Sequence, residues 1–144
     1  MNQAILQPML VLAGWTMFVW IWMYATRLPA MSRAGIDGTK MVGSTGKGLR
    51  DQLVAAGEER ASWVADNYNH LMEQPTIFYA VALALAVMGA GDGLAFQLAW
   101  GYTGLRIAHS LVQIIWNRVL VRFALFSLAT FCLMGLVLIA LAAS

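Results

Sequence analysis

The sequence predicts an all-α integral membrane protein in which four transmembrane helices form a bundle. Of its 144 residues, 60% are hydrophobic and only 11% are charged, and the mean hydropathy is +0.69. This is too little polar surface to cover a water-soluble domain of this size. The apolar residues also form long runs, and about 20 helical residues cross a hydrocarbon core roughly 30 Å thick. These runs leave room for a single domain, residues 1–144.

The first helix is expected at about residues 4–30, because the run from Met1 to Thr26 carries no charge. This run lacks the basic start and the small-residue cleavage site of a secretory signal, so we expect it to be retained. Its second half is rich in aromatic residues that favour the membrane interface, namely Trp15, Trp20, Trp22 and Tyr24. The other helices are expected at about residues 49–90, 93–117 and 119–143. Glycine and small polar residues predict a loop from Ser32 to Gly48, and the second helix should extend beyond the bilayer.

The basic residues predict the orientation in the membrane. Apart from Arg106, they lie between the first two uncharged runs and between the last two, whereas the link between the second and third helices carries only Asp92. By the positive-inside rule, both basic loops are cytoplasmic and both termini face outward. Basic residues this few and this scattered do not favour a nucleic-acid partner. The loop residues are Arg27, Arg33, Lys40, Lys47, Arg50 and Arg60, followed by Arg118 and Arg122.

Two polar stripes occur within the apolar helices. They comprise Ser62, Asp66, Asn69, Glu73 and Thr76 on the second helix, and Arg106, His109, Gln113 and Asn117 on the third. At about 100° per residue, each stripe falls within an arc of roughly 80°. Ionisable groups at this depth are costly unless they are paired or hydrated, so Glu73 and Arg106 should face protein or a water-filled cavity. Asp66 and Asn67 are expected to be solvated near the interface.

Two interpretations of the stripes are open. They either join helices, with Glu73 and Arg106 as a buried ion pair and Asn69 bonded to Gln113, or they form a binding site for a small anionic ligand. The polar groups outnumber what packing needs, which favours the binding site. No metal site is expected, because Cys132 stands alone and no paired metal-ligand motif occurs.

The run from Asn69 to Pro75, followed by Arg106, His109, Asn117, Arg118 and Arg122, resembles the superfamily of membrane-associated proteins in eicosanoid and glutathione metabolism, MAPEG. The resemblance covers nearly the whole chain and suggests a bacterial-type relative of microsomal glutathione transferases, in the inner membrane. It implies a homotrimer with glutathione bound between subunits near the cytoplasmic side. It also implies a lipophilic small-molecule substrate that reaches the site from membrane lipid.

The resemblance also implies roles for individual residues. Glu73 would hold the amino group of glutathione, and Asn69 or His70 would stand near the family's asparagine. Arg106 and His109 would contact the peptide or brace the site, and Arg122 would stabilise the thiolate. Gln113 and Arg118 complete the candidate glutathione-binding residues.

The chain departs from the family pattern at several places. Asp66 stands where family enzymes often carry an arginine, and Gln113 replaces a tyrosine. Phe123 and Phe126 occupy positions after Arg122 where hydroxyl residues are expected. Arg122 would therefore activate the thiol without a hydroxyl group, since a guanidinium favours the thiolate and cannot lose its own proton.

The expected function is glutathione transferase or peroxidase activity toward lipophilic electrophiles. The alternative is a non-enzymatic binding or accessory protein of the same fold, so the resemblance leaves enzyme status open. A small drug/proton antiporter is disfavoured, because the first helix contains no acidic residue.

Overall fold

The computed structural model describes residues 3–144, and this part of the chain is helical. The first two residues of the predicted domain lie outside the described part. The elements are α1 (Leu6–Arg33), a short 3-10 helix η1 (Gly38–Lys40), α2 (Gly46–Ala55), α3 (Glu59–Leu71), α4 (Pro75–Val87), α5 (Gly93–Ile115) and α6 (Val119–Ala143).

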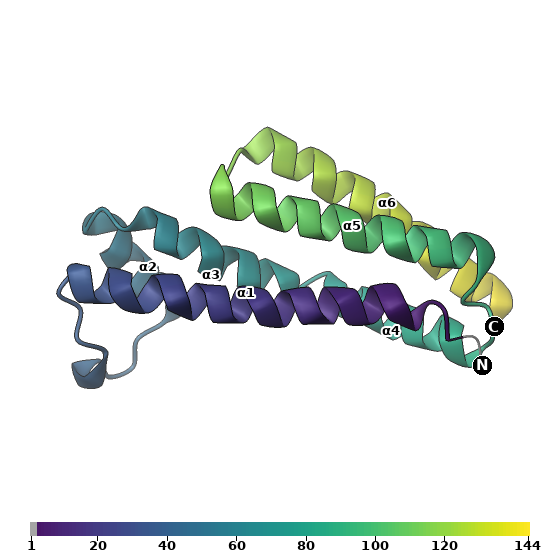
Figure 1. Ribbon diagram of the computed structural model, residues 1–144, viewed down its shortest axis with the longest axis horizontal. Coiled ribbons are helices and arrows are strands. Elements are labelled where there is room, and N and C mark those ends of the chain that lie inside the picture. The colour runs from purple at the N-terminus through teal and green to yellow at the C-terminus, as the bar shows by residue number, and fades with distance from the viewer. Residues whose placement is uncertain (1–2) are drawn as a thin grey trace.

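The long helices run along a common axis (Figure 1). Helix α1 lies against α3 and α4, and α5 and α6 form a hairpin that packs on this group, α5 against α1 and α3, and α6 against α4. The start of α1, the end of α6 and the turn between α4 and α5 lie at one end of the bundle (Figure 1). At the other end, α1 and α3 extend past the α5–α6 turn and are joined there by η1 and α2 (Figure 1).

The predicted single helix at 49–90 is wrong, because the structure divides this segment into α2, α3 and α4. Helix α2 ends at Ala55, and two residues later Gly57 has a φ of +81°, which suits glycine. The amide groups of Gly57 and Glu58 bond back to Val54 and Leu53, which closes the helix end. The second break precedes Pro75, which has no backbone N–H and whose ring clashes with the carbonyl four residues earlier.

Within residues 3–144, three helical stretches are long and apolar enough to cross a membrane: Leu6–Arg33, Glu59–Val87 and Val119–Ala143. The second of these contains both α3 and α4. Helix α5 has 23 residues, the length of a span, but is less apolar than these three. Its buried residues include Arg106, His109 and Gln113. The fourth crossing therefore stays a prediction.

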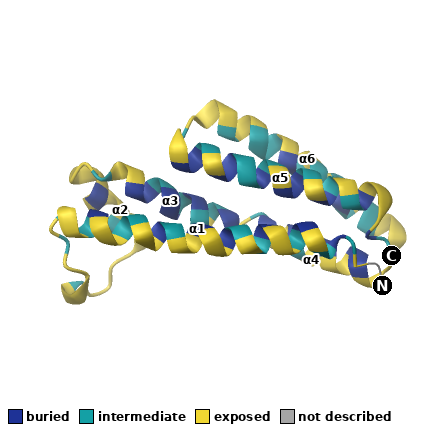
Figure 2. Cartoon of the chain, viewed as in Figure 1, coloured by how far each residue is buried: buried dark blue, intermediate teal, exposed yellow. Residues whose placement is uncertain are grey.

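The main apolar core lies between α1, α3, α4, α5 and α6. Phe78 and Tyr102 are fully buried and stack with ring centroids 4.5 Å apart. Helices α5 and α6 approach closely where Gly135 faces Leu98, since a Cβ at Gly135 would lie 2.8 Å from a Leu98 methyl group. Small residues permit such close packing of membrane helices. Exposed residues run along the outward sides of α1 and α6, whereas α5 is buried along much of its length (Figure 2).

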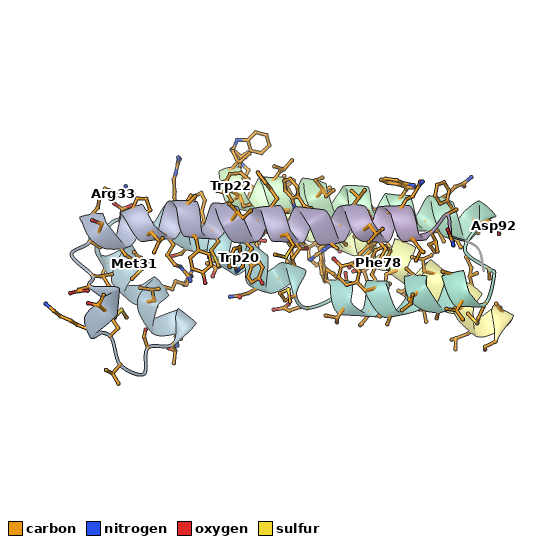
Figure 3. The ribbon with its side chains drawn as sticks, turned by 60° about the horizontal axis from the view of Figure 1, so that its bottom comes forward. Trp20, Trp22, Met31, Arg33, Phe78 and Asp92 are labelled. Atoms are coloured by element: carbon orange, nitrogen blue, oxygen red, sulfur yellow. The ribbon has the colours of Figure 1, made fainter. Side chains whose placement is uncertain are left out.

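Charged groups mark the two ends of the bundle. Trp20 and Trp22 project from the middle of α1, Arg33 lies at its end beside α2, and Asp92 lies at the opposite end (Figure 3). Arg33 Nε donates to Glu58 Oε1 at 2.7 Å. This hydrogen bond, together with the positive charge of Arg33, holds the pKa of the exposed Glu58 carboxyl below its ordinary value.

Candidate functional site

Arg106 is the centre of a polar cluster where the chain breaks between α3 and α4. Its side chain is fully buried, as the sequence predicted for a charge in this helix. Nη2 donates to the carbonyl of His70 at 3.1 Å, near the carboxyl end of α3, and the guanidinium carbon lies 5.7 Å from the Phe126 ring centroid. A cation is favoured both at a helix carboxyl end and over an aromatic face. Nε has no partner within residues 3–144.

His70 links Arg106 to Glu73. Its Nε2 lies 3.5 Å from Arg106 Nη1, and its Nδ1 lies 3.3 Å from Glu73 Oε2. A guanidinium only donates and a carboxylate only accepts. Nε2 of His70 is therefore the acceptor and Nδ1 carries the proton that is donated to Glu73. The Glu73 side chain is 71% exposed in the single chain, so it is open to a ligand.

His109 lies across from His70 on α5. The two rings have centroids 4.9 Å apart, and His109 also lies 6.3 Å from the Phe126 ring. His70 and His109 line a pocket of about 220 Å³. The remaining lining residues all come from the first part of α6: Val119, Arg122, Phe123 and Phe126.

Arg122 is held at the edge of this pocket by the α5–α6 turn. Asn117 ends α5 with a φ of +50°, a left-handed conformation that asparagine tolerates better than most residues. Its Oδ1 accepts a hydrogen bond of 2.6 Å from Arg122 Nη1. Arg122 is half-buried, whereas Arg118, one turn earlier, is exposed and lies outside the pocket lining.

Asn69 lies in a second pocket, of about 260 Å³, between the end of α1, the start of α2 and α3. This pocket is rich in basic residues. Arg50 pairs with Asp66 at 3.2 Å, whereas Arg27 and Lys47 make no ion pair within residues 3–144. Arg27 Nε and Ser62 Oγ are buried without a hydrogen-bond partner in this part of the chain. The lining residues are Arg27, Gly46, Lys47, Arg50, Ser62, Ala65, Asp66 and Asn69.

The polar contact between α3 and α5 differs from the predicted one. The prediction that Asn67 is solvated is wrong, because its side chain is 1% exposed and its amide donates to Ser110 Oγ. Trp15 Nε1 donates to the same oxygen at 2.9 Å. Asn69, which the helix-joining interpretation placed against Gln113, is exposed instead.

The interpretation that the stripes join the helices is also not supported at its two named pairs, Glu73 with Arg106 and Asn69 with Gln113. Within residues 3–144, Arg106 makes its hydrogen bonds with His70 and has no ion pair with Glu73. Gln113 is buried, and its Oε1 has no partner in the described chain. Asn67 and Ser110 form a further polar contact between α3 and α5.

The structure therefore brings together four of the predicted site residues, His70, Glu73, His109 and Arg106, with Arg122 at the rim. It separates Asn69 and Arg118 from this pocket. Sequence reasoning missed Arg27, which lines the second pocket with Ser62 and Asn69. In the sequence, Arg27 was interpreted only as a basic residue that sets the orientation of a helix in the membrane. No spacing rule relates its position to α3.

Comparison with known proteins identifies one family. The model of the MAPEG family matches residues 5–142, which is nearly the whole chain. No curated protein and no solved structure matches.

Proposed function

The chain belongs to the MAPEG family, and from this premise we propose that it binds glutathione and joins its sulfur to lipophilic electrophiles. Its three apolar stretches make it a multi-pass membrane protein. The pocket between His70, His109 and Arg122 would hold the thiol. The observation that carries this proposal is a half-buried arginine at the rim of a pocket that is also lined by two histidines and two phenylalanine rings.

Arg122 is suited to stabilise a thiolate. The thiolate, not the thiol, is the nucleophile, and a nearby guanidinium favours it without being able to lose a proton. One Nη of Arg122 is bonded to Asn117, which fixes the side chain and leaves other N–H groups for a ligand. Nε in particular has no partner in the described chain. The apolar walls supplied by Phe123 and Phe126 would strengthen this attraction by excluding water.

The other polar groups of glutathione also have candidate partners. Its amino group would bind Glu73, whose carboxylate is exposed beside His70. Its two carboxylates would bind the second pocket, where Arg27 and Lys47 have no acidic partner within residues 3–144. These basic residues would replace the arginine that family enzymes often carry at the place of Asp66.

We propose that the site is completed by a neighbouring subunit of a homotrimer. Pockets for small molecules commonly measure about 300–1,000 Å³, whereas the two pockets of the candidate site measure about 220 and 260 Å³. Each would be one wall of a larger site between subunits. In this arrangement the chain crosses the bacterial inner membrane four times, with the termini outward and both basic loops in the cytoplasm.

The lipophilic substrate would approach from the bilayer. An apolar groove of about 350 Å³ runs between α4 and α6 and is lined by Ile77, Leu133, Met134 and Val137, among others. Gln74, at the start of α4, lies in the same groove and donates to Thr130 Oγ1 at 2.9 Å. An apolar electrophile would partition into such a groove from lipid, and proximity to the thiolate would supply much of the rate enhancement.

Glutathione titration of the detergent-solubilised protein tests this proposal. Calorimetry should detect binding, and the ultraviolet absorbance of bound thiolate should titrate below the free thiol value of about 8.5. Arg122→Leu should remove the thiolate signal and retain binding, whereas Arg118→Leu should retain both. An undiminished thiolate signal in Arg122→Leu would remove Arg122 from the mechanism, and an absence of binding would overturn the proposal.

A non-enzymatic glutathione-binding protein is the second candidate. The observation that favours it is that Phe123 and Phe126 line the pocket where family enzymes carry hydroxyl residues. Binding without any thiolate signal and without turnover of a lipophilic electrophile would support this alternative.

A further inference from the structure

His109 is the polar side chain lining this pocket that makes no hydrogen bond within residues 3–144. The residue is only 2% exposed. Its ring contacts within residues 3–144 are with His70 and Phe126, and no hydrogen bond to either nitrogen occurs in this part of the chain. Buried polar groups are nearly always paired, so an unpaired imidazole that lines a pocket points to a ligand.

His70, by comparison, is fully engaged. Arg106 donates toward its Nε2, and its Nδ1 donates to Glu73. No lone pair of His70 is therefore free for a substrate. His109 lines the same pocket and has this capacity, since a neutral imidazole carries one free acceptor nitrogen.

Positively charged and polar groups surround His109. Arg106 lies on the same helix, Arg122 faces the pocket from α6, and His70 faces it from α3. The nearest carboxylate in this cluster, Glu73, lies beyond His70. Two guanidinium groups around His109 oppose a third positive charge there.

We propose that His109 accepts the thiol proton of glutathione, an inference that rests on the function proposed above. The S–H bond breaks, its electron pair stays on sulfur, and the proton forms an N–H bond with the imidazole. The imidazolium then gives this proton to water at the open side of the pocket. No oxidant or reductant takes part.

His109 and Arg122 have separate tasks in this scheme. Arg122 stabilises the thiolate and sets how much of it is present at equilibrium. His109 provides the path for the proton and sets how fast the thiolate appears. The same two guanidinium groups that stabilise the anion make the imidazolium short-lived, so the base returns to its neutral form.

The test is a rapid-mixing measurement of thiolate absorbance after glutathione is added to the solubilised full-length protein. General base catalysis contributes about 10²–10⁴-fold, so His109→Gln and His109→Phe should slow thiolate appearance by about 100-fold or more. The final thiolate level and the affinity should be nearly retained. Added imidazole should restore the rate in His109→Ala. Ser110→Ala, the next residue on α5, is the matched control and should keep the wild-type rate.

The wild-type pH dependence provides a test that needs no variant. Proton removal by an imidazole gives a rate that levels off with pH, whereas removal by hydroxide gives a rate that rises about tenfold per pH unit. A continuous rise would overturn the proposal. An unchanged rate of thiolate appearance in the folded His109 variants would also overturn the proposal, whether or not their glutathione binding is weaker. This result would leave the proposed function intact. Absence of glutathione binding by the wild-type protein would overturn both.

Discussion

Helices α5 and α6 have similar lengths but opposite surroundings. Helix α5 buries nine of its residues, among them Arg106, His109 and Gln113. Helix α6 buries only three, all apolar, and exposes large side chains such as Phe131 and Leu138. The difference shows that α6 is built to face an apolar solvent on most sides, whereas α5 is solvated by the rest of the chain. Polar chemistry within the bundle is possible only on the second kind of helix.

The largest expected effect tests whether α5 depends on its buried charge. Arg106→Met removes the hydrogen bond to the His70 carbonyl and leaves that part of the α3 end unpaired, so it should lower the free energy of unfolding by about 3 kcal/mol. Thermal unfolding of the solubilised protein measures this loss. Phe131→Leu on α6 is the control and should change stability by less than about 0.5 kcal/mol. Equal losses of unfolding free energy in the two variants would contradict the idea that α5, unlike α6, depends on a buried charge.

The next effect concerns how the charge of Arg106 is balanced. If the His70 carbonyl and the Phe126 ring are enough to stabilise the positive charge of Arg106, Glu73 is free to bind a ligand. Glu73→Gln should then weaken glutathione binding by about 1.5–3 kcal/mol, the value of a charge-assisted hydrogen bond. The melting temperature should hardly change, because the carboxylate is largely exposed. A sharp fall in melting temperature would mean that Glu73 instead neutralises Arg106.

A smaller effect is expected at the contact between α3 and α5. Asn67→Ala should lower the free energy of unfolding by about 1–2 kcal/mol, because Ser110 and the buried amide lose their hydrogen bond. Asn69→Ala, on the exposed side of the same helix, is the matched control and should have almost no effect. A double-mutant cycle with Ser110→Ala measures the coupling. Additive losses in that cycle would contradict a direct contact.

The smallest effect is expected for the solvent-exposed ion pair between Arg33 and Glu58. Because Arg33 lowers the pKa of Glu58, the pair stabilises the fold above the ordinary glutamate value of about 4.3, and this contribution is lost as the pH falls through the lower folded value. The difference in melting temperature between wild type and Glu58→Gln should therefore be small near neutral pH and should disappear at acidic pH. Added salt should also reduce it. Glu59→Gln, which breaks no ion pair within residues 3–144, should show no such gap.

The sequence alone determined the class of the protein and the approximate places of its helices. Long apolar runs have few alternatives to membrane helices, since only a helix or a closed barrel satisfies its own backbone in lipid. The same argument predicted that Arg106 is buried in protein. Family membership could also be inferred from residues that are close in sequence, in the run from Asn69 to Pro75 and in the spacing of Arg106 and His109.

Only the tertiary structure decided which polar groups meet. Asn67 and Asn69 are about 200° apart around a helix, so only one of them can face α5, and the sequence contains no signal for which. The break before Pro75 divides the predicted stripe, and Glu73 lies in this break and turns outward beside His70. The pocket at Arg122 depends on the hairpin of α5 and α6, and the pocket at Arg27 on the return of α2 toward α1. These contacts join residues far apart in sequence, and helical periodicity describes only the faces of single helices.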